Sequence, residues 1–138
     1  MRIYLDTFVF MDLLSDNPEF AKKALGYLEK IKSGENRGCI SAALFTELAF
    51  HIKRRKGAEK ASEIIYYIQS LPNLEIIPLT SEIAQAAGLL RSKLIKYQKK
   101  FTYFDCIHLA TAIGEKCDVF VTGDRGFRDV ADIKVEIY

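Results

Sequence analysis

Short apolar segments alternate with helical segments along the whole chain, and this alternation limits the fold more than any other feature. Four segments have the length and composition of β-strands: Arg2–Asp6, Leu74–Ile77, Val119–Thr122 and Lys134–Ile137. Cys39–Ser41 is also apolar but is too short to assign by itself. Strands that alternate with helices are typical of a parallel sheet covered on both faces, so we predict an α/β fold with a mainly parallel central sheet.

The helices between these strands are predicted from apolar residues at helical spacing and from residues that start or stop a helix. Asparagine, serine or threonine before a periodic segment favours a helix start, and glycine after it favours an end. The expected limits are Asn17-Pro18 and Ser33-Gly34 for the first helix, Gly57 between the second and third, Ser81 as the cap of the fourth, and Thr102 to Gly114 for the last.

The composition fits one globular domain that spans residues 1–138. Hydrophobic residues make up 49% of the chain and charged residues 28%, which argues against disorder or a disulfide scaffold. No apolar stretch approaches the ~20 residues of a membrane span, and no signal-peptide pattern is present, so we expect no membrane association. The three cysteines show no C-x-x-C spacing, so we expect a reducing, cytoplasmic location and no zinc site.

Four acidic residues stand where ligands bind in such a sheet. Asp6 ends the first strand, and Asp124 follows the strand Val119–Thr122. Glu47 and Asp105 lie early in two helices. Because parallel strands end at one edge of the sheet, we expect all four carboxylates to converge at that edge.

Each acid also has an ordinary structural explanation. Asp6 could cap a following helix, and Asp124 could stabilise a turn. Asp105 could form a capping box with Thr102, and Glu47 could be solvated or pair with a histidine one turn later. None of these explanations accounts for four acids at one end of the sheet.

Converging carboxylates repel one another, and burial disfavours their charged forms further. A hard divalent cation relieves this repulsion, since Mg²⁺ and Mn²⁺ prefer oxygen ligands. Such an ion can activate a water molecule and neutralise charge that develops on phosphorus. No serine or cysteine stands beside a base at this edge, so we do not expect covalent catalysis.

Four segments of the chain resemble the PIN-domain nucleases, and most closely the VapC-type toxin ribonucleases. They are Tyr4–Thr7, Thr46–Leu48, Phe104–Ala112 and Val119–Phe127. The resemblance implies a three-layer α/β/α sandwich that holds Mg²⁺ or Mn²⁺ and hydrolyses RNA. It also implies the toxin of a toxin–antitoxin pair, which forms a homodimer and is inhibited by a small antitoxin protein.

The resemblance extends to individual residues. It assigns metal binding and catalysis to the four acids, Asp6, Glu47, Asp105 and Asp124. Residue chemistry and the resemblance together suggest supporting roles for four neighbours: water or phosphate positioning for Thr122 and Arg125, and contacts that support the acids for Thr7 and His108.

Two positions depart from the family pattern. Phe8 stands where related sequences carry Asn or Ser, and Gly126 replaces a second acid in the last loop. These departures keep a second hypothesis open, in which the chain is a weakly active or inactive RNA-binding module of the same fold. A third hypothesis is a haloacid-dehalogenase-like phosphatase, but that family needs an aspartate at the position of Phe8.

The charge that remains outside the acidic quartet suits a polyanionic substrate. The chain has 20 lysines and arginines against 14 acids other than the four, a net charge of +6. The basic run Lys53–Lys56 could contact phosphates, although a solvated helix end is the more common role of such a run. For His108, ordinary packing in the core is the alternative to a contact with the acids.

Overall fold

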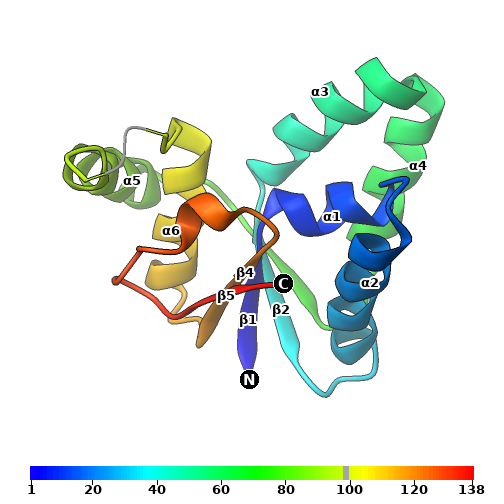
Figure 1. The fold of residues 1–138 in the computed structure, drawn as a ribbon, viewed down its shortest axis with the longest axis horizontal. Coiled ribbons are helices and arrows are strands. Elements are labelled where there is room, and N and C mark those ends of the chain that lie inside the picture. Colours follow the sequence, from blue (N-terminus) through cyan, green and yellow to red (C-terminus); the bar gives the residue numbers. More distant parts are fainter. Residues whose placement is uncertain (98–99) are drawn as a thin grey trace.

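The computed structural model describes residues 1–97 and 100–138, and it contains a five-stranded sheet between two layers of helices (Figure 1). All neighbouring strands are parallel, in the order β3-β2-β1-β4-β5. The strands are β1 (Arg2–Leu5), β2 (Arg37–Ser41), β3 (Leu74–Ile77), β4 (Val119–Thr122) and β5 (Val135–Ile137). The predicted three-layer α/β/α fold is confirmed, and the short Cys39–Ser41 segment belongs to a full strand.

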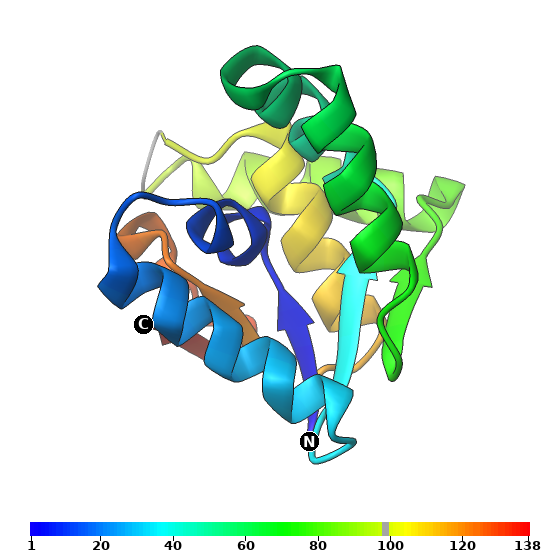
Figure 2. The same cartoon turned by 90° about the vertical axis from the view of Figure 1, so that its right-hand side faces the viewer.

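The helices divide between the two faces of the sheet. Figure 1 shows α1 to α4 on one side and α5 and α6 on the other, and in Figure 2 α2 and α4 lie in front of the strands. The helices are α1 (Thr7–Leu13), α2 (Pro18–Lys32), α3 (Leu44–Lys56), α4 (Ala58–Gln69), α5 (Ser81–Leu94) and α6 (Tyr103–Gly114). None of the helices in the described part of the chain has the length and apolar character that crossing a bilayer requires.

Alternating side chains of the central strand serve two separate cores. Ile3 and Leu5 of β1 are buried against α1 to α4. Tyr4, between them, is fully buried on the opposite face with α5 and α6. This period of two is expected for a strand covered on both faces, and it places Tyr4 on the side of α6.

The helix ends follow local capping chemistry, with one correction to the sequence prediction. Asn17 caps α2 as expected, since its side chain accepts a hydrogen bond from the backbone N–H of Glu19. Gly57, with φ at 92°, separates α3 from α4. The prediction that Ser81 caps α5 is wrong: Thr80 is the cap and accepts from the N–H of Ile83, because Ser81 is already in the helix.

The order of the strands in the sheet reverses between β1 and β4. The chain adds β2 and β3 on one side of β1, and then adds β4 and β5 on the other. Crevices at such a switch point are where open parallel sheets bind ligands, beyond the carboxyl ends of the strands. The backbone N–H of Asp6 donates to the carbonyl of Val121 at 3.0 Å, so Asp6 stands at this edge directly beside the end of β4.

Candidate functional site

Thr122 joins two of the predicted acids at the switch point. Its hydroxyl donates to Oδ2 of Asp6 at 2.8 Å and accepts from the backbone N–H of Asp124 at 3.0 Å. Asp6 and Thr122 are both buried, with 2% and 0% of their surface exposed. Asp6 occupies the N-cap position of α1, but its side chain makes no capping bond, so helix capping does not explain this acid.

Asp105 is held at the same edge by the start of α6. The side chain of Thr102 accepts from the N–H of Asp105 at 3.1 Å, and Oδ2 of Asp105 accepts from the N–H of Thr102 at 2.9 Å. The capping box expected as the ordinary explanation is therefore present. It does not exclude a second role, because a carboxylate has about four lone-pair positions and this bond uses one.

Glu47 contacts a histidine, but a different one from the histidine one turn later in α3. Its Oε1 lies 2.6 Å from Nε2 of His108 and accepts from the hydroxyl of Thr7 at 2.8 Å. Thr7 and His108 were the two predicted supporting residues, and both contact this acid. His108 is 1% exposed and Glu47 21% exposed, so the contact lies at the boundary between core and solvent.

Tyr4 is a member of this network that the sequence analysis missed. Its hydroxyl oxygen lies 2.6 Å from Nδ1 of His108 and accepts from the backbone N–H of Ser41 at 2.9 Å. The strand period offered a signal, since Tyr4 must face α6 when Ile3 and Leu5 face the other helices. What the sequence does not contain is the register between residue 4 and a helix about a hundred positions later.

The electrostatics of the site show that three acids interact. The pKa of Asp6 is raised to about 6, mainly by burial and in addition by the charge of Asp105, while His108 and Thr122 oppose the shift. Burial also raises the pKa of Asp105, and the charge of Asp124 adds to this effect. These carboxylates are thus close enough for each to disfavour ionisation of the next.

The pair formed by Glu47 and His108 shifts in the opposite sense. Burial raises the pKa of Glu47, but the hydrogen bond and charge of His108 outweigh it, so the net pKa is lowered. Burial lowers the pKa of His108, but Glu47 and then Asp6 outweigh it, so the net pKa is raised. Each partner favours the charged form of the other.

The chemistry of the donor atoms suits a hard divalent cation, but the acids are not yet arranged around a single position for one. Across residues 1–97 and 100–138, no group of three or more His, Cys, Asp or Glu side chains is close enough together to hold a metal ion. The available donors are nevertheless all oxygens, and their mutual repulsion is what a cation would relieve. A small cavity of about 50 Å³ opens between Asp105 and Asp124.

The turn after β4 places the last two predicted residues. The N–H of Gly126 donates to Oδ1 of Asp124 at 2.8 Å, and a Cβ at position 126 would lie 3.1 Å from that oxygen. Glycine therefore allows the turn to close tightly on Asp124. Arg125 is exposed on the same turn, and its role in phosphate positioning stays a prediction.

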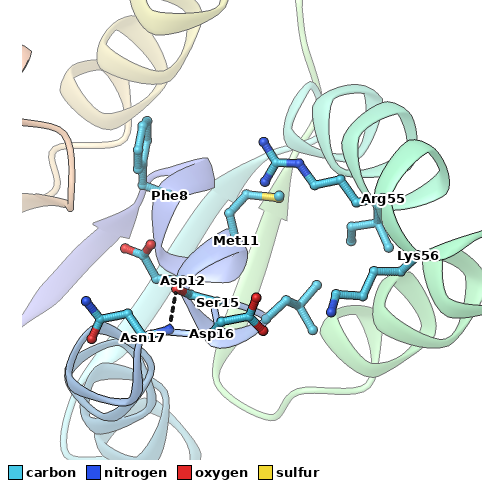
Figure 3. Close-up of a pocket in the computed structure, with 10 residues that line it drawn as sticks. Phe8, Met11, Asp12, Ser15, Asp16, Asn17, Arg55 and Lys56 are labelled. Carbon is cyan, nitrogen blue, oxygen red and sulfur yellow. Dashed lines mark hydrogen bonds between the residues drawn. The ribbon is translucent and has the colours of Figure 1, made fainter.

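A large cavity of the described chain is lined by none of the four predicted acids. It has a volume of about 550 Å³ and is lined from α1, from the loop that follows α1 and from the end of α3. Figure 3 shows Phe8 and Asp12 on one wall and Arg55 and Lys56 on the other. Phe8, which follows Asp6 by two residues, is 45% exposed and lines this cavity.

A family profile and solved structures relate this chain to known proteins. Residues 3–133 match the sequence profile of the family described as PIN domain. No curated protein matches the chain significantly in sequence.

Solved structures with the same fold come from several bacteria. A chain of the VapBC2 complex of Rickettsia felis, bound to a promoter DNA fragment, is 22% identical with a TM-score of 0.78, and the match covers 99% of this chain and 98% of that one. FitAcB of Neisseria gonorrhoeae is 23% identical with a TM-score of 0.72, over 96% and 95%. VapC20 of Mycobacterium tuberculosis, described as a toxin that cleaves the sarcin-ricin loop, is 14% identical with a TM-score of 0.71, over 95% and 98%.

Proposed function

Since the chain belongs to the PIN-domain family, we propose that it is a divalent-metal-dependent endoribonuclease and the toxin of a toxin–antitoxin pair. One observation supports this proposal above all others. The Thr122 hydroxyl links Asp6 to the backbone of Asp124 at the switch point of a parallel sheet. Asp105 lies close enough to raise the pKa of Asp6. Membership of this family also argues against the phosphatase hypothesis.

In this proposal, Asp6, Asp105 and Asp124 bind Mg²⁺ or Mn²⁺, and Glu47 completes the site. The ion supplies activation of water and neutralisation of the charge that develops on phosphorus. The hydroxyl of Thr122 keeps the Asp6 carboxylate in one orientation and leaves its remaining lone pairs for the ion. Thr102 does the same for Asp105.

The cations of the chain bind and orient RNA. Arg125 is exposed beside Asp124 and contacts a phosphate next to the scissile bond. Arg55 and Lys56 line the large cavity and bind phosphates farther along the strand. These contacts hold the substrate while the acids act on it.

An antitoxin partner is the regulatory part of the proposal. Similar structures come from complexes named VapBC in Rickettsia felis and Salmonella typhimurium, and from FitAcB in Neisseria gonorrhoeae. We infer that a small antitoxin occupies the acidic cleft of this chain and that the active protein is a homodimer. A cytoplasmic location agrees with the three cysteines, which are all free and buried.

Replacement of one acid tests the proposed activity. We expect Asp6→Asn to lower the rate of RNA cleavage in Mn²⁺ by at least about 100-fold, equivalent to about 3 kcal/mol of transition-state stabilisation. Asp129→Asn, the same change at an exposed acid, is the matched control and should cleave at the parental rate. A folded Asp6→Asn protein that cleaves as fast as the parent contradicts the assignment.

The alternative of an inactive RNA-binding module has one observation in its favour. Phe8, two residues after Asp6, exposes an aromatic ring at the large cavity, at a position where related sequences carry a polar residue, and exposed rings stack on bases. In that case the parental protein binds Mn²⁺ and RNA but hydrolyses none of a varied set of RNA substrates. Cleavage that depends on Asp6 excludes this alternative.

A further inference from the structure

A line of hydrogen bonds runs from the backbone of Ser41 through Tyr4 and His108 to Glu47. The donor of each bond in this line can be assigned. The backbone N–H of Ser41 can only donate, so the Tyr4 oxygen accepts this bond. The Tyr4 hydroxyl has one hydrogen, and within the described residues the other partner of its oxygen is Nδ1 of His108, at 2.6 Å. The hydroxyl therefore donates to Nδ1.

This direction determines which nitrogen of the imidazole carries the proton. A neutral imidazole has one N–H and one acceptor nitrogen. With Nδ1 accepting from Tyr4, the hydrogen is on Nε2, which lies 2.6 Å from Oε1 of Glu47. The charge of Glu47 favours a doubly protonated ring at low pH, but that form leaves the Tyr4 hydrogen without an acceptor among the described residues, so we expect the neutral ring with its hydrogen on Nε2 at pH 8.

The same arrangement leaves the two oxygens of Glu47 unequal. Oε1 accepts from the Thr7 hydroxyl at 2.8 Å and faces Nε2–H of His108. No hydrogen bond from the described residues reaches Oε2. One oxygen is thus held by the protein, and the other is available to a ligand at the partly exposed end of the side chain.

We propose that His108 is a positioning residue whose tautomer is set by Tyr4, so that its Nε2–H holds Glu47 with one carboxylate oxygen directed to the metal site. The role of Glu47 as a ligand rests on the proposed function, whereas the tautomer does not. The backbone of Ser41, at the end of β2, is the fixed point from which the line starts.

The first test reads the tautomer directly and needs neither metal nor RNA. Long-range ¹⁵N–¹H NMR spectra of the full chain at pH 8 should show His108 protonated at Nε2 and unprotonated at Nδ1. In Tyr4→Phe, which removes only the hydroxyl, we expect the Nδ1–H form to become populated. An Nδ1–H or doubly protonated ring in the parental protein overturns the proposal.

The second test asks whether the contact matters for metal binding, with the Mn²⁺ concentration that gives half of the maximal rise in melting temperature as the readout. Residues that orient metal ligands usually contribute 10–100-fold to affinity. For His108→Met, whose side chain has no N–H donor, we expect this Mn²⁺ concentration to increase by about 10-fold or more. His108→Gln places an amide N–H near the position of Nε2 and should restore most of the affinity.

The outcomes separate this proposal from the proposed function. If His108→Met binds Mn²⁺ as tightly as the parent, His108 is only a core residue and the proposal fails. If His108→Met does not fold, Tyr4→Phe decides, and unchanged Mn²⁺ affinity there overturns the proposal. If the parental protein shows the expected tautomer but neither binds Mn²⁺ nor cleaves RNA, the proposed function fails while the hydrogen-bonding assignment stands.

Discussion

At the scale of single residues, the site is distinguished by acids that are buried next to one another. Asp6 is 2% exposed, and its hydrogen bond from Thr122 only partly offsets the loss of solvation. Buried acids of this kind destabilise a protein in their ionised form, and they persist where function requires them. This electrostatic cost depends on the pH and on whether a metal ion is bound.

Without metal, the burial of Asp6 makes the stability of the protein depend on pH. The pKa of Asp6 is raised from 3.8 to about 6, so between these pH values the folded state binds more protons than the unfolded state. The free energy of unfolding therefore falls as the pH rises through this window. We expect Asp6→Asn to be more stable than the parent at pH 7 by about 2–3 kcal/mol, and by much less at pH 4.

Urea denaturation in EDTA at several pH values measures this difference. The Asp129→Asn variant, changed at an exposed acid, controls for the general effect of removing one negative charge. A stability difference between Asp6→Asn and the parent that does not vary with pH contradicts the burial argument.

Asp105 carries a similar cost, since burial and the charge of Asp124 together raise its pKa. Asp105→Asn relieves the repulsion, so its melting temperature in EDTA should exceed that of the parent by several degrees. Millimolar Mn²⁺ should raise the melting temperature of the parent by mass action and that of the variant much less. An equal Mn²⁺ response in both proteins removes Asp105 from the proposed site.

At the scale of elements, two threonine caps offer a matched pair. Thr80 caps α5 and Thr102 caps α6, and both side chains accept a hydrogen bond from a backbone N–H three residues later. Only at α6 is the residue that donates to the cap a predicted metal-binding acid, Asp105, whose Oδ2 in turn accepts from the backbone N–H of Thr102.

We expect Thr80→Ala and Thr102→Ala to lower the free energy of unfolding by a similar amount, about 1 kcal/mol each. Only Thr102→Ala should also weaken Mn²⁺ binding and slow RNA cleavage, because the backbone N–H of Asp105 loses its acceptor and the first turn of α6, which carries this acid, is held less firmly. Thermal melting and Mn²⁺ titration of both variants check this expectation. Equal effects of both variants on Mn²⁺ binding would indicate that the cap acts through stability alone.

The sequence predicted most elements because their signals are local. The limits of β3, β4 and the start of α2 follow from turn and cap residues close by, as at Asn17. The cap of α5 was misplaced by one residue because Thr80 and Ser81 are adjacent and both suit an N-cap. Local signals thus fix the type of an element better than its first residue.

The sequence indicated which acids lie near one another at this edge, but not the hydrogen bonds that connect them to their neighbours. The rule that parallel strands end together was enough to place Asp6 and Asp124 at one edge. It was not enough to choose between two histidines for Glu47, or to find Tyr4. Those contacts depend on the packing of α3 and α6 over β1, which depends on the whole core.

At the scale of the whole molecule, basic side chains lie near both edges of the sheet. The carboxyl edge carries the acids together with Arg55 and Lys56 at the end of α3. The last turn of α2, which precedes β2, carries its own basic residues, among them Lys30. Only the cations near the acids should contact an RNA strand that is being cleaved.

A salt titration distinguishes the two groups of cations. Binding to single-stranded nucleic acid weakens with salt by a slope of about 0.7 for each neutralised phosphate. We expect Lys56→Gln to weaken RNA binding to the Asp6→Asn protein and to reduce this slope by about 0.7. Lys30→Gln, a matched change in the last turn of another helix, should leave the slope unaltered. Equal slopes for both variants would show that the cavity beside α3 does not bind RNA.

The account depends above all on Asp6, Asp105 and Asp124 sharing one divalent cation. Anomalous diffraction from a crystal soaked in Mn²⁺ measures this most directly, because the signal locates the ion without assumptions about its ligands. We predict a Mn²⁺ peak bounded by these three carboxylates, with an oxygen of Glu47 directed toward it. A protein that binds Mn²⁺ only elsewhere, with the three carboxylates turned away from one another, would contradict the account.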